Sequence, residues 1–167
     1  MSGVCSPSQT IGPLYGYALM FDGSNQTIEP DAAGAVRIIG SVVDGSGAAI
    51  AHPDAMVEIW QAEQWARARA DESGEFEFIV RKPAVTRLPD GRKQAPHFTV
   101  AVFASGLLKQ VVTRLYFPDE QAANADDPVL GYVPRGDRER LIAQAVPGGL
   151  RFDIHLQGAQ ESVFFAF

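Results

Sequence analysis

Residues 36–80 constrain the fold most strongly, because this segment holds three short apolar runs separated by turns rich in Asp, Gly and Ser. In the third run, Phe76, Phe78 and Val80 occupy alternate positions and share one face. Alternation with a period of two is typical of a strand with one buried face. The segment therefore predicts three strands, at residues 36–43, 55–62 and 75–80.

Later segments continue this pattern, with little sign of helix. Three further apolar runs predict strands at residues 97–104, 111–117 and 150–157. Residues 83–96 contain three prolines and are predicted to form a loop. Seven or so short strands indicate an all-β fold, a two-sheet antiparallel β-sandwich with an extended N-terminal arm.

Helix-forming composition is confined to three short segments. Residues 60–70 suit either a short helix or an irregular excursion, and residues 119–125 suit one helical turn. Residues 137–145 are the strongest candidate, since Pro147 and two glycines follow them. We expect these helices to be minor additions to the sheets.

The two ends of the chain are unusually apolar. Residues 1–35 look irregular and include the aromatic run 14–21, while residues 162–167 read SVFFAF. Apolar segments of this kind are rarely left in water. The first segment either covers a sheet edge or the bottom of the core, or it reaches a partner subunit. The predicted division is an arm over residues 1–35 and a sandwich domain over residues 36–167.

Composition excludes several classes of function. The 167 residues carry a net charge of −6, which argues against nucleic acid or an anionic membrane as partner. No run reaches the ~18 apolar residues of a membrane span, and no signal peptide is evident. The single cysteine, Cys5, fits a reducing compartment, so a cytoplasmic location is expected.

The residues alone indicate no catalytic constellation. Nucleophile elbows, phosphate-binding loops and zinc-ligand spacings are absent from the sequence. His97 stands at the start of a strand beside a basic loop, but Thr99 occupies the position where a second ligand on the same face would be. Glu58 and Asp153 are interpreted as strand-face or paired structural residues. On this basis the chain is only a soluble β-sandwich with an apolar arm and tail.

A series of short segments, taken in order, resembles the intradiol ring-cleavage dioxygenases. The segments are Val57-Glu58-Ile59-Trp60-Gln61-Ala62, Asp71-x-x-Gly74-x-Phe76-x-Phe78, Lys82-Pro83, Ala95-Pro96-His97, Thr113-Arg114-Leu115-Tyr116-Phe117 and Arg151-Phe152-Asp153-Ile154-x-Leu156-Gln157-Gly158. Both ends resemble one branch of that family, the alpha chains of protocatechuate 3,4-dioxygenases. Those ends are Thr10-Ile11-Gly12-Pro13, preceded by Ser-Pro-Ser-Gln, and Glu161-Ser162-Val163-Phe164-Phe165.

The resemblance implies an enzyme that inserts both atoms of O2 into a catechol ring, between the hydroxyl-bearing carbons. In this family a ferric non-haem iron is held by two tyrosines and two histidines of the beta chain. Here Ala68 and Thr86 stand near the tyrosine positions, and His97-x-Thr99 retains one histidine. The resemblance therefore implies no metal ligands and no catalytic residues in this chain, with Fe(III) bound by the partner beta chain.

The resemblance also implies a supporting role in an αβ protomer, itself part of a higher hetero-oligomer. The chain would pack on the homologous beta chain and line its pocket for a catechol-type substrate. The candidate lining residues are Thr10, Gly12, Pro13, Leu14, Tyr15, Ser105, Arg135 and Arg138.

Two positions depart from the branch pattern. Leu14 stands where a tyrosine is common, and Ser105 stands where an arginine often binds the substrate's carboxylate. Without that guanidinium, a bidentate contact with the anion is missing. We therefore expect either a ring substituent other than a carboxylate, such as a sulfonate, or another anion-binding residue, with Arg135 and Arg138 as candidates. Residues 65–71 form a loop that is short for this branch, which would open the pocket mouth beside His97.

Two other readings remain open. The strand pattern of residues 36–80 fits a stand-alone, prealbumin-like β-sandwich binding module equally well. A hydrolase or other enzyme acting alone is the weaker alternative, because the sequence shows no catalytic constellation for it.

Overall fold

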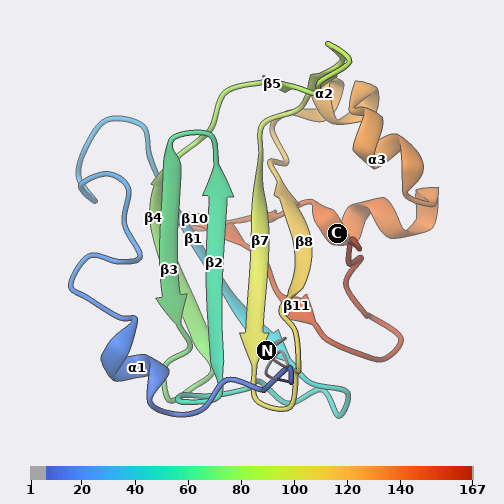
Figure 1. Cartoon of the computed structure of the whole chain (residues 1–167). Coiled ribbons are helices and arrows are strands. Elements are labelled where there is room, and N and C mark those ends of the chain that lie inside the picture. Colours follow the sequence, from blue (N-terminus) through green and yellow to red (C-terminus); the bar gives the residue numbers. More distant parts are fainter. Residues whose placement is uncertain (1–6, 167) are drawn as a thin grey trace, which may run out of the picture.

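A computed structural model describes residues 7–166 of the chain, and its strands form two packed sheets (Figure 1). The first sheet is built around β1 (Ala35–Val43), which pairs antiparallel with β4 (Glu75–Arg81). Three short strands complete this sheet: β9 (Gln144–Val146), β10 (Gly149–Arg151) and β11 (Ile154–His155).

The second sheet is antiparallel throughout and has its strands in the order β3-β2-β7-β8. Its strands are β2 (Ala55–Gln61), β3 (Gln64–Arg69), β7 (His97–Ala104) and β8 (Val111–Tyr116). The predicted loop 83–96 includes a small hairpin of β5 (Thr86–Arg87) and β6 (Lys93–Gln94). The helices are α1 (Tyr15–Ala18), α2 (Gln121–Asp126), α3 (Pro128–Tyr132) and the 3₁₀ helix η1 (Arg135–Leu141). None of the helices within residues 7–166 is long and apolar enough to cross a bilayer.

The main core lies between the two sheets. The buried core residues of the first sheet include Ile38, Val42, Phe76 and Phe78, and those of the second include Val57, Ile59, Val100 and Val102. Each set occupies alternate positions along its strands, as expected where one face of a sheet is buried. The predicted all-β sandwich is therefore confirmed.

The last predicted strand, residues 150–157, is split in two. β10 and β11 both run parallel to β1, so the sandwich is not purely antiparallel. Between them, the Phe152 amide donates to the Ile39 carbonyl at 2.8 Å, and the Asp153 carboxylate accepts from the Ser41 amide at 3.0 Å. The Asp153 side chain thus takes the place of a backbone acceptor in the pairing with β1, and this interrupts the strand. Residues 150–157 still alternate between the two faces of the sheet.

Residues 60–70 form neither the short helix nor the irregular excursion considered from the sequence, because β2 and β3 form a tight hairpin there. Its turn places Ala62 at φ 47°, in the left-handed region. Ala66 and Ala68 then face the core, while Trp65 and Arg67 face outward. The spacing of this Ala-Arg run is that of a strand, so alternation outweighed helix propensity. The expected short loop at residues 65–71 is likewise mostly strand.

The other two helix predictions fared differently. The turn expected at residues 119–125 is confirmed as α2. The α-helix expected at residues 137–145 is wrong in type and extent: η1 is a 3₁₀ helix, and β9 follows it. β9 pairs with β10 across the Pro147-Gly148 turn, so pairing with the sheet ends the helical segment early.

Both apolar ends lie against this chain's own sandwich. The Tyr15 hydroxyl donates to the Ala55 carbonyl at 2.6 Å, and Phe165 forms a bridge to Val112 of β8. Residues 7–34 thus contact β2, and they pair with the edges of β3 and β4 through Ser24 and through residues 25–27. Coverage of a sheet edge is one of the two readings of the arm. Cys5 and Phe167 fall outside the described residues.

Candidate functional site

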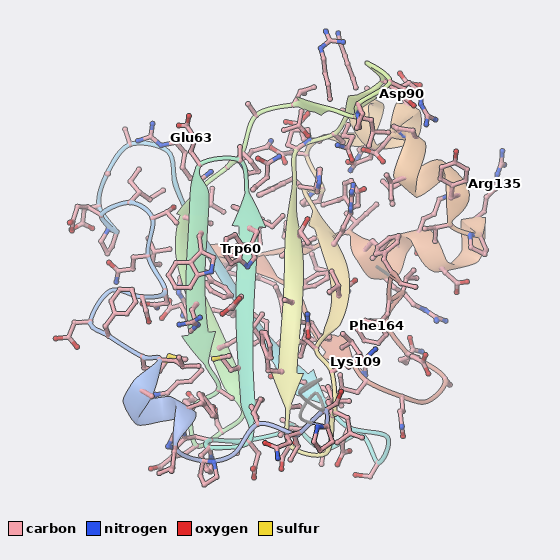
Figure 2. All side chains as sticks on the ribbon, in the orientation of Figure 1. Trp60, Glu63, Asp90, Lys109, Arg135 and Phe164 are labelled. Atoms are coloured by element: carbon pink, nitrogen blue, oxygen red, sulfur yellow. The ribbon has the colours of Figure 1, made fainter. Side chains whose placement is uncertain are left out.

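One candidate site is a pocket of about 360 Å³ on the outer face of the second sheet. Directly paired residues of antiparallel strands share a face, so Trp60, Thr99 and Arg114 stand in a row across β2, β7 and β8. The β5–β6 hairpin adds Thr86 and the 7% exposed Gln94 to the walls, and His97 closes the upper end. Trp60 is half exposed and lies on the outer face of β2 (Figure 2).

His97 contributes a neutral imidazole to this pocket. It is buried, and its Nδ1 lies 2.7 Å from the Ala95 carbonyl oxygen. Because a carbonyl can only accept, Nδ1 carries the proton and Nε2 keeps its lone pair. Burial, with help from the Arg114 charge, lowers the pKa of His97 to about 4. The ring is thus uncharged at neutral pH.

Arg114 is the cation of the pocket, and a buried network holds it in place. Its guanidinium donates to Gln94 Oε1 at 2.8 Å and to the Tyr116 hydroxyl at 3.2 Å. Tyr116 in turn donates to the Asp127 carboxylate at 3.2 Å. Burial raises the pKa of Tyr116 well above its ordinary value, so the phenol stays protonated and serves as this donor.

Asp127 anchors the far end of this network. Its carboxylate accepts from the Ala95 amide at 2.8 Å and caps α3 through the amides of Val129 and Leu130. Asp127 is only 2% exposed, so these donors take the place of its lost hydration. The network thereby fixes the β6–β7 junction, and with it His97, against α3.

These residues do not fit an iron site. Thr86, His97 and Thr99 do meet at one pocket, but His97 alone has a nitrogen ligand, and neutral hydroxyls are poor ligands for Fe³⁺. Ala68 faces the opposite side of the sheet, in the core, so it does not join them. Within residues 7–166 no group of three or more His, Cys, Asp or Glu side chains is placed to hold a metal.

The arm residues lie at the other end of the second sheet. Thr10 accepts from the Gly106 amide at 2.7 Å and its hydroxyl lies 3.4 Å from the Ala104 carbonyl oxygen. Leu14 is 74% exposed, whereas Tyr15 is buried with its hydroxyl bonded to Ala55. Thr10 borders a small cavity of about 240 Å³. In the single chain, Tyr15 is therefore a packing residue.

The remaining predicted lining residues do not form one site within this chain. Ser105 is close to the arm, since its amide donates to Asp54 and the next residue contacts Thr10. Gly12 and Pro13 precede α1 and are exposed. Arg135 and Arg138 lie in η1, and Figure 2 shows Arg135 on the far side of the molecule from the arm. Arg138 donates to the Val133 carbonyl at 2.9 Å, so it helps to hold α3 and η1 together.

Comparison with known proteins gives the family. No protein-family model matches the chain. The protocatechuate 3,4-dioxygenase alpha chain of Pseudomonas putida is 36% identical over 195 aligned positions, covering 97% of this chain and 96% of that protein. The chain belongs to the protocatechuate 3,4-dioxygenase alpha-chain family. The alpha chain of Burkholderia cepacia is 35% identical, with 96% of each chain covered.

Solved structures agree with this family in fold. Hydroxyquinol 1,2-dioxygenase from Pseudomonas putida DLL-E4 has a TM-score of 0.57 at 15% identity, covering 93% of this chain and 67% of that one. The dioxygenase domain of a Streptomyces fusion protein has a TM-score of 0.56 at 18% identity, with 81% and 88% covered. At 15–18% identity, these solved dioxygenases share the fold of this chain.

Sequence reasoning missed the Arg114 network. Arg114 and Tyr116 alternate along a predicted strand with Thr113 and Leu115, so their shared face could have been deduced. Asp127 lies in a segment without periodicity, and nothing local indicated that its carboxylate joins two distant elements.

Proposed function

We propose that this chain is the iron-free alpha subunit of a protocatechuate 3,4-dioxygenase-like enzyme. Its partner is a homologous beta chain that binds Fe(III) and cleaves a substituted catechol with O2 to a cis,cis-muconate. Alone, this chain neither binds iron nor turns over substrate. A cytoplasmic location accompanies this role, in keeping with the single cysteine of the sequence.

Two observations together support the proposal. The chain matches alpha chains over nearly its full length, and the side chains at its pocket are unsuited to binding iron. The relatives named alpha chains align with 96–97% of this chain. At the pocket where the family resemblance expects ligands, Thr86 and Thr99 offer neutral hydroxyls, and Ala68 faces the core. A fold retained without a fitting donor set is expected of a supporting subunit.

Exposed apolar side chains support a role for the arm at a partner surface. Leu14 is 74% exposed and Phe21 is 59% exposed, and both flank α1. In this proposal residues 1–35 pack on the beta chain, and Thr10, Gly12 and Pro13 border its substrate. Obligate interfaces are large and apolar, which suits this composition.

The test is co-expression with the candidate beta chain, followed by iron analysis and visible spectra of each chain and of the complex. We expect a coloured complex with iron in proportion to the beta chain, and a colourless alpha chain. Stoichiometric iron and ring cleavage by this chain alone would refute the proposal. A stable monomer that ignores the beta chain would instead favour the prealbumin-like binding module.

We further propose that the ring substituent of the substrate is an anion other than a simple carboxylate, such as a sulfonate. Ser105 stands where an arginine is common in the branch, and its hydroxyl cannot form a bidentate ion pair. Steady-state kinetics of the complex with a panel of 4-substituted catechols test this. We expect kcat/KM to be higher for the sulfonate than for the carboxylate, and the reverse order would rule the idea out.

A further inference from the structure

We propose that the pocket around Arg114 is a ligand site of this chain and binds a small aromatic carboxylate without a metal. The inference does not rest on the proposed subunit role, because every residue that carries it belongs to this chain. This pocket does not fit an iron site, and ligand binding would give it a function.

Arg114 gives the pocket a positive charge. Arg114 makes no salt bridge with any residue in the range 7–166, and the pocket lining contains no carboxylate. The nearest acid in its network, Asp127, lies behind Tyr116 and is occupied by four donors. His97 is uncharged at neutral pH. A carboxylate entering the pocket therefore meets one cation and, among residues 7–166, no opposing anion in the pocket lining.

Hydrogen bonds hold the Arg114 guanidinium in position before any ligand binds. Only one guanidinium nitrogen of Arg114, Nη1, is used by Gln94 and Tyr116, which leaves the Nε and Nη2 donors without a hydrogen-bond acceptor among residues 7–166. Gln94 is itself buried, and its amide lies 3.4 Å from the Thr86 hydroxyl. An arginine held in this way loses little rotamer freedom on binding, and its planar fork matches a carboxylate.

The size of the pocket and its Trp60 wall suit one aromatic ring. A volume of about 360 Å³ is at the lower end of small-molecule sites. Trp60 forms one wall, is half exposed, and is held by Trp65 at a centroid distance of 5.7 Å and by a 3.2 Å bond to Glu58. A fixed indole is a suitable stacking surface for one aromatic ring. Together, the cation and the indole favour a flat aromatic acid over a simple inorganic anion.

The experiment is calorimetric titration of the full-length chain with benzoate, in whatever assembly it is purified. We expect saturable binding at one site per chain, at least tenfold weaker in Arg114→Gln, with an intermediate loss in Arg114→Lys. Trp60→Ala should weaken binding several-fold; since Trp60 is outside the core, this variant remains informative if Arg114→Gln fails to fold. Arg37→Gln, the same change at an exposed arginine of β1 that pairs with Glu77, should bind like the wild type.

Three results would overturn the inference: no saturable binding with a Kd below about 10 mM, equal binding by the wild type, Arg114→Gln and Trp60→Ala, or an equal loss in Arg37→Gln. If an iron-bearing partner is present, benzoate can also bind at the iron. Such binding is measured separately, as a change in the visible spectrum of the iron site. That spectral response should be unchanged by Arg114→Gln. A missing partner would contradict the proposed function but leave this test intact.

Discussion

At the residue scale, one carboxylate connects three parts of the chain that are distant in sequence. Asp127 joins the end of β6, the side chain of Tyr116 in β8 and the first turn of α3. A buried charge is tolerated only where several donors replace water. Asp127 therefore stabilises the fold and positions the pocket at the same time.

Replacing Asp127 by Ala should lower the free energy of unfolding by about 3 kcal/mol, because several buried donors lose their acceptor at once. Urea unfolding followed by circular dichroism measures this change. Asp126→Ala is the matched control: its side chain is exposed, and we expect a change within about 0.5 kcal/mol. Equal effects of the two substitutions would contradict the role given to the network.

His97 should make the fold sensitive to mild acid. Its pKa is about 4 in the folded chain, against about 6.5 when unfolded, so the unfolded state takes up a proton first as the pH falls. Stability from His97 is therefore complete above pH 6.5 and is lost as the pH falls towards 4. The linkage predicts a loss of about 2 kcal/mol between pH 8 and pH 5.

His97→Gln should remove that part of the pH dependence, as measured by urea unfolding at both pH values. His155→Gln provides the control, since the His155 side chain makes no hydrogen bond among residues 7–166. An unchanged pH dependence in His97→Gln would show that His97 is not buried as a neutral ring.

At the scale of elements, β1 is the strand on which the first sheet depends. It pairs with β4 on one edge and with β10 and β11 on the other. Gly40 lies inside β1, opposite Phe152, the residue that follows β10. A Cβ atom at position 40 would overlap the Phe152 carbonyl oxygen and contact the Phe76 ring too closely. The close approach of two backbones thus explains a glycine inside a strand.

Gly40→Ala should cost at least about 3 kcal/mol, because the clash is with a backbone atom that cannot rotate away. The yield of folded protein and the thermal midpoint report this cost. Gly131→Ala is the contrasting change: a Cβ there meets no atom within 4 Å, and the thermal midpoint should stay the same or rise slightly. A Gly40→Ala protein as stable as the wild type would contradict the packing described for β1.

The sequence predicts elements well wherever one face of a strand is buried. Residues 75–80 and 97–104 alternate clearly, and both strands are present at nearly those bounds. Residues 60–70 misled because alanine and arginine favour helices in isolation, whereas tertiary pairing with β2 decides the outcome. The parallel pairing of β10 and β11 with β1 depends on contacts more than 100 residues apart, which local pattern does not encode.

The candidate site is less predictable than the fold. His97 and Thr99 were recognisable together because they are two apart on one strand. Arg114, Gln94 and Asp127 come from different elements, so only the folded chain shows that they converge. The family resemblance put Ala68 near a tyrosine-ligand position, whereas in the hairpin the Ala68 side chain faces the core.

At the scale of the whole molecule, the exposed apolar residues of the arm should control association with a partner. The double change Leu14→Asp with Phe21→Asp puts charge on two exposed positions and should leave the fold intact. We expect co-purification of a tagged beta chain to fall at least tenfold. Val85→Asp, also at an exposed apolar residue but outside the arm, should assemble normally. If both variants assemble equally well, the arm is not the main contact.

The second sheet has two outer strands, and short contacts from other parts of the chain occupy both. Along β3, the Arg67 amide donates to the Ser24 carbonyl at 2.7 Å. Along β8, Phe165 donates to Val112 at 2.8 Å, and Ala143 donates to Tyr116 at 2.9 Å. Unoccupied outer strands invite other chains to add to a sheet and aggregate. These few bonds therefore cover part of both outer strands and limit the addition of other chains to this sheet, whether or not a partner is bound.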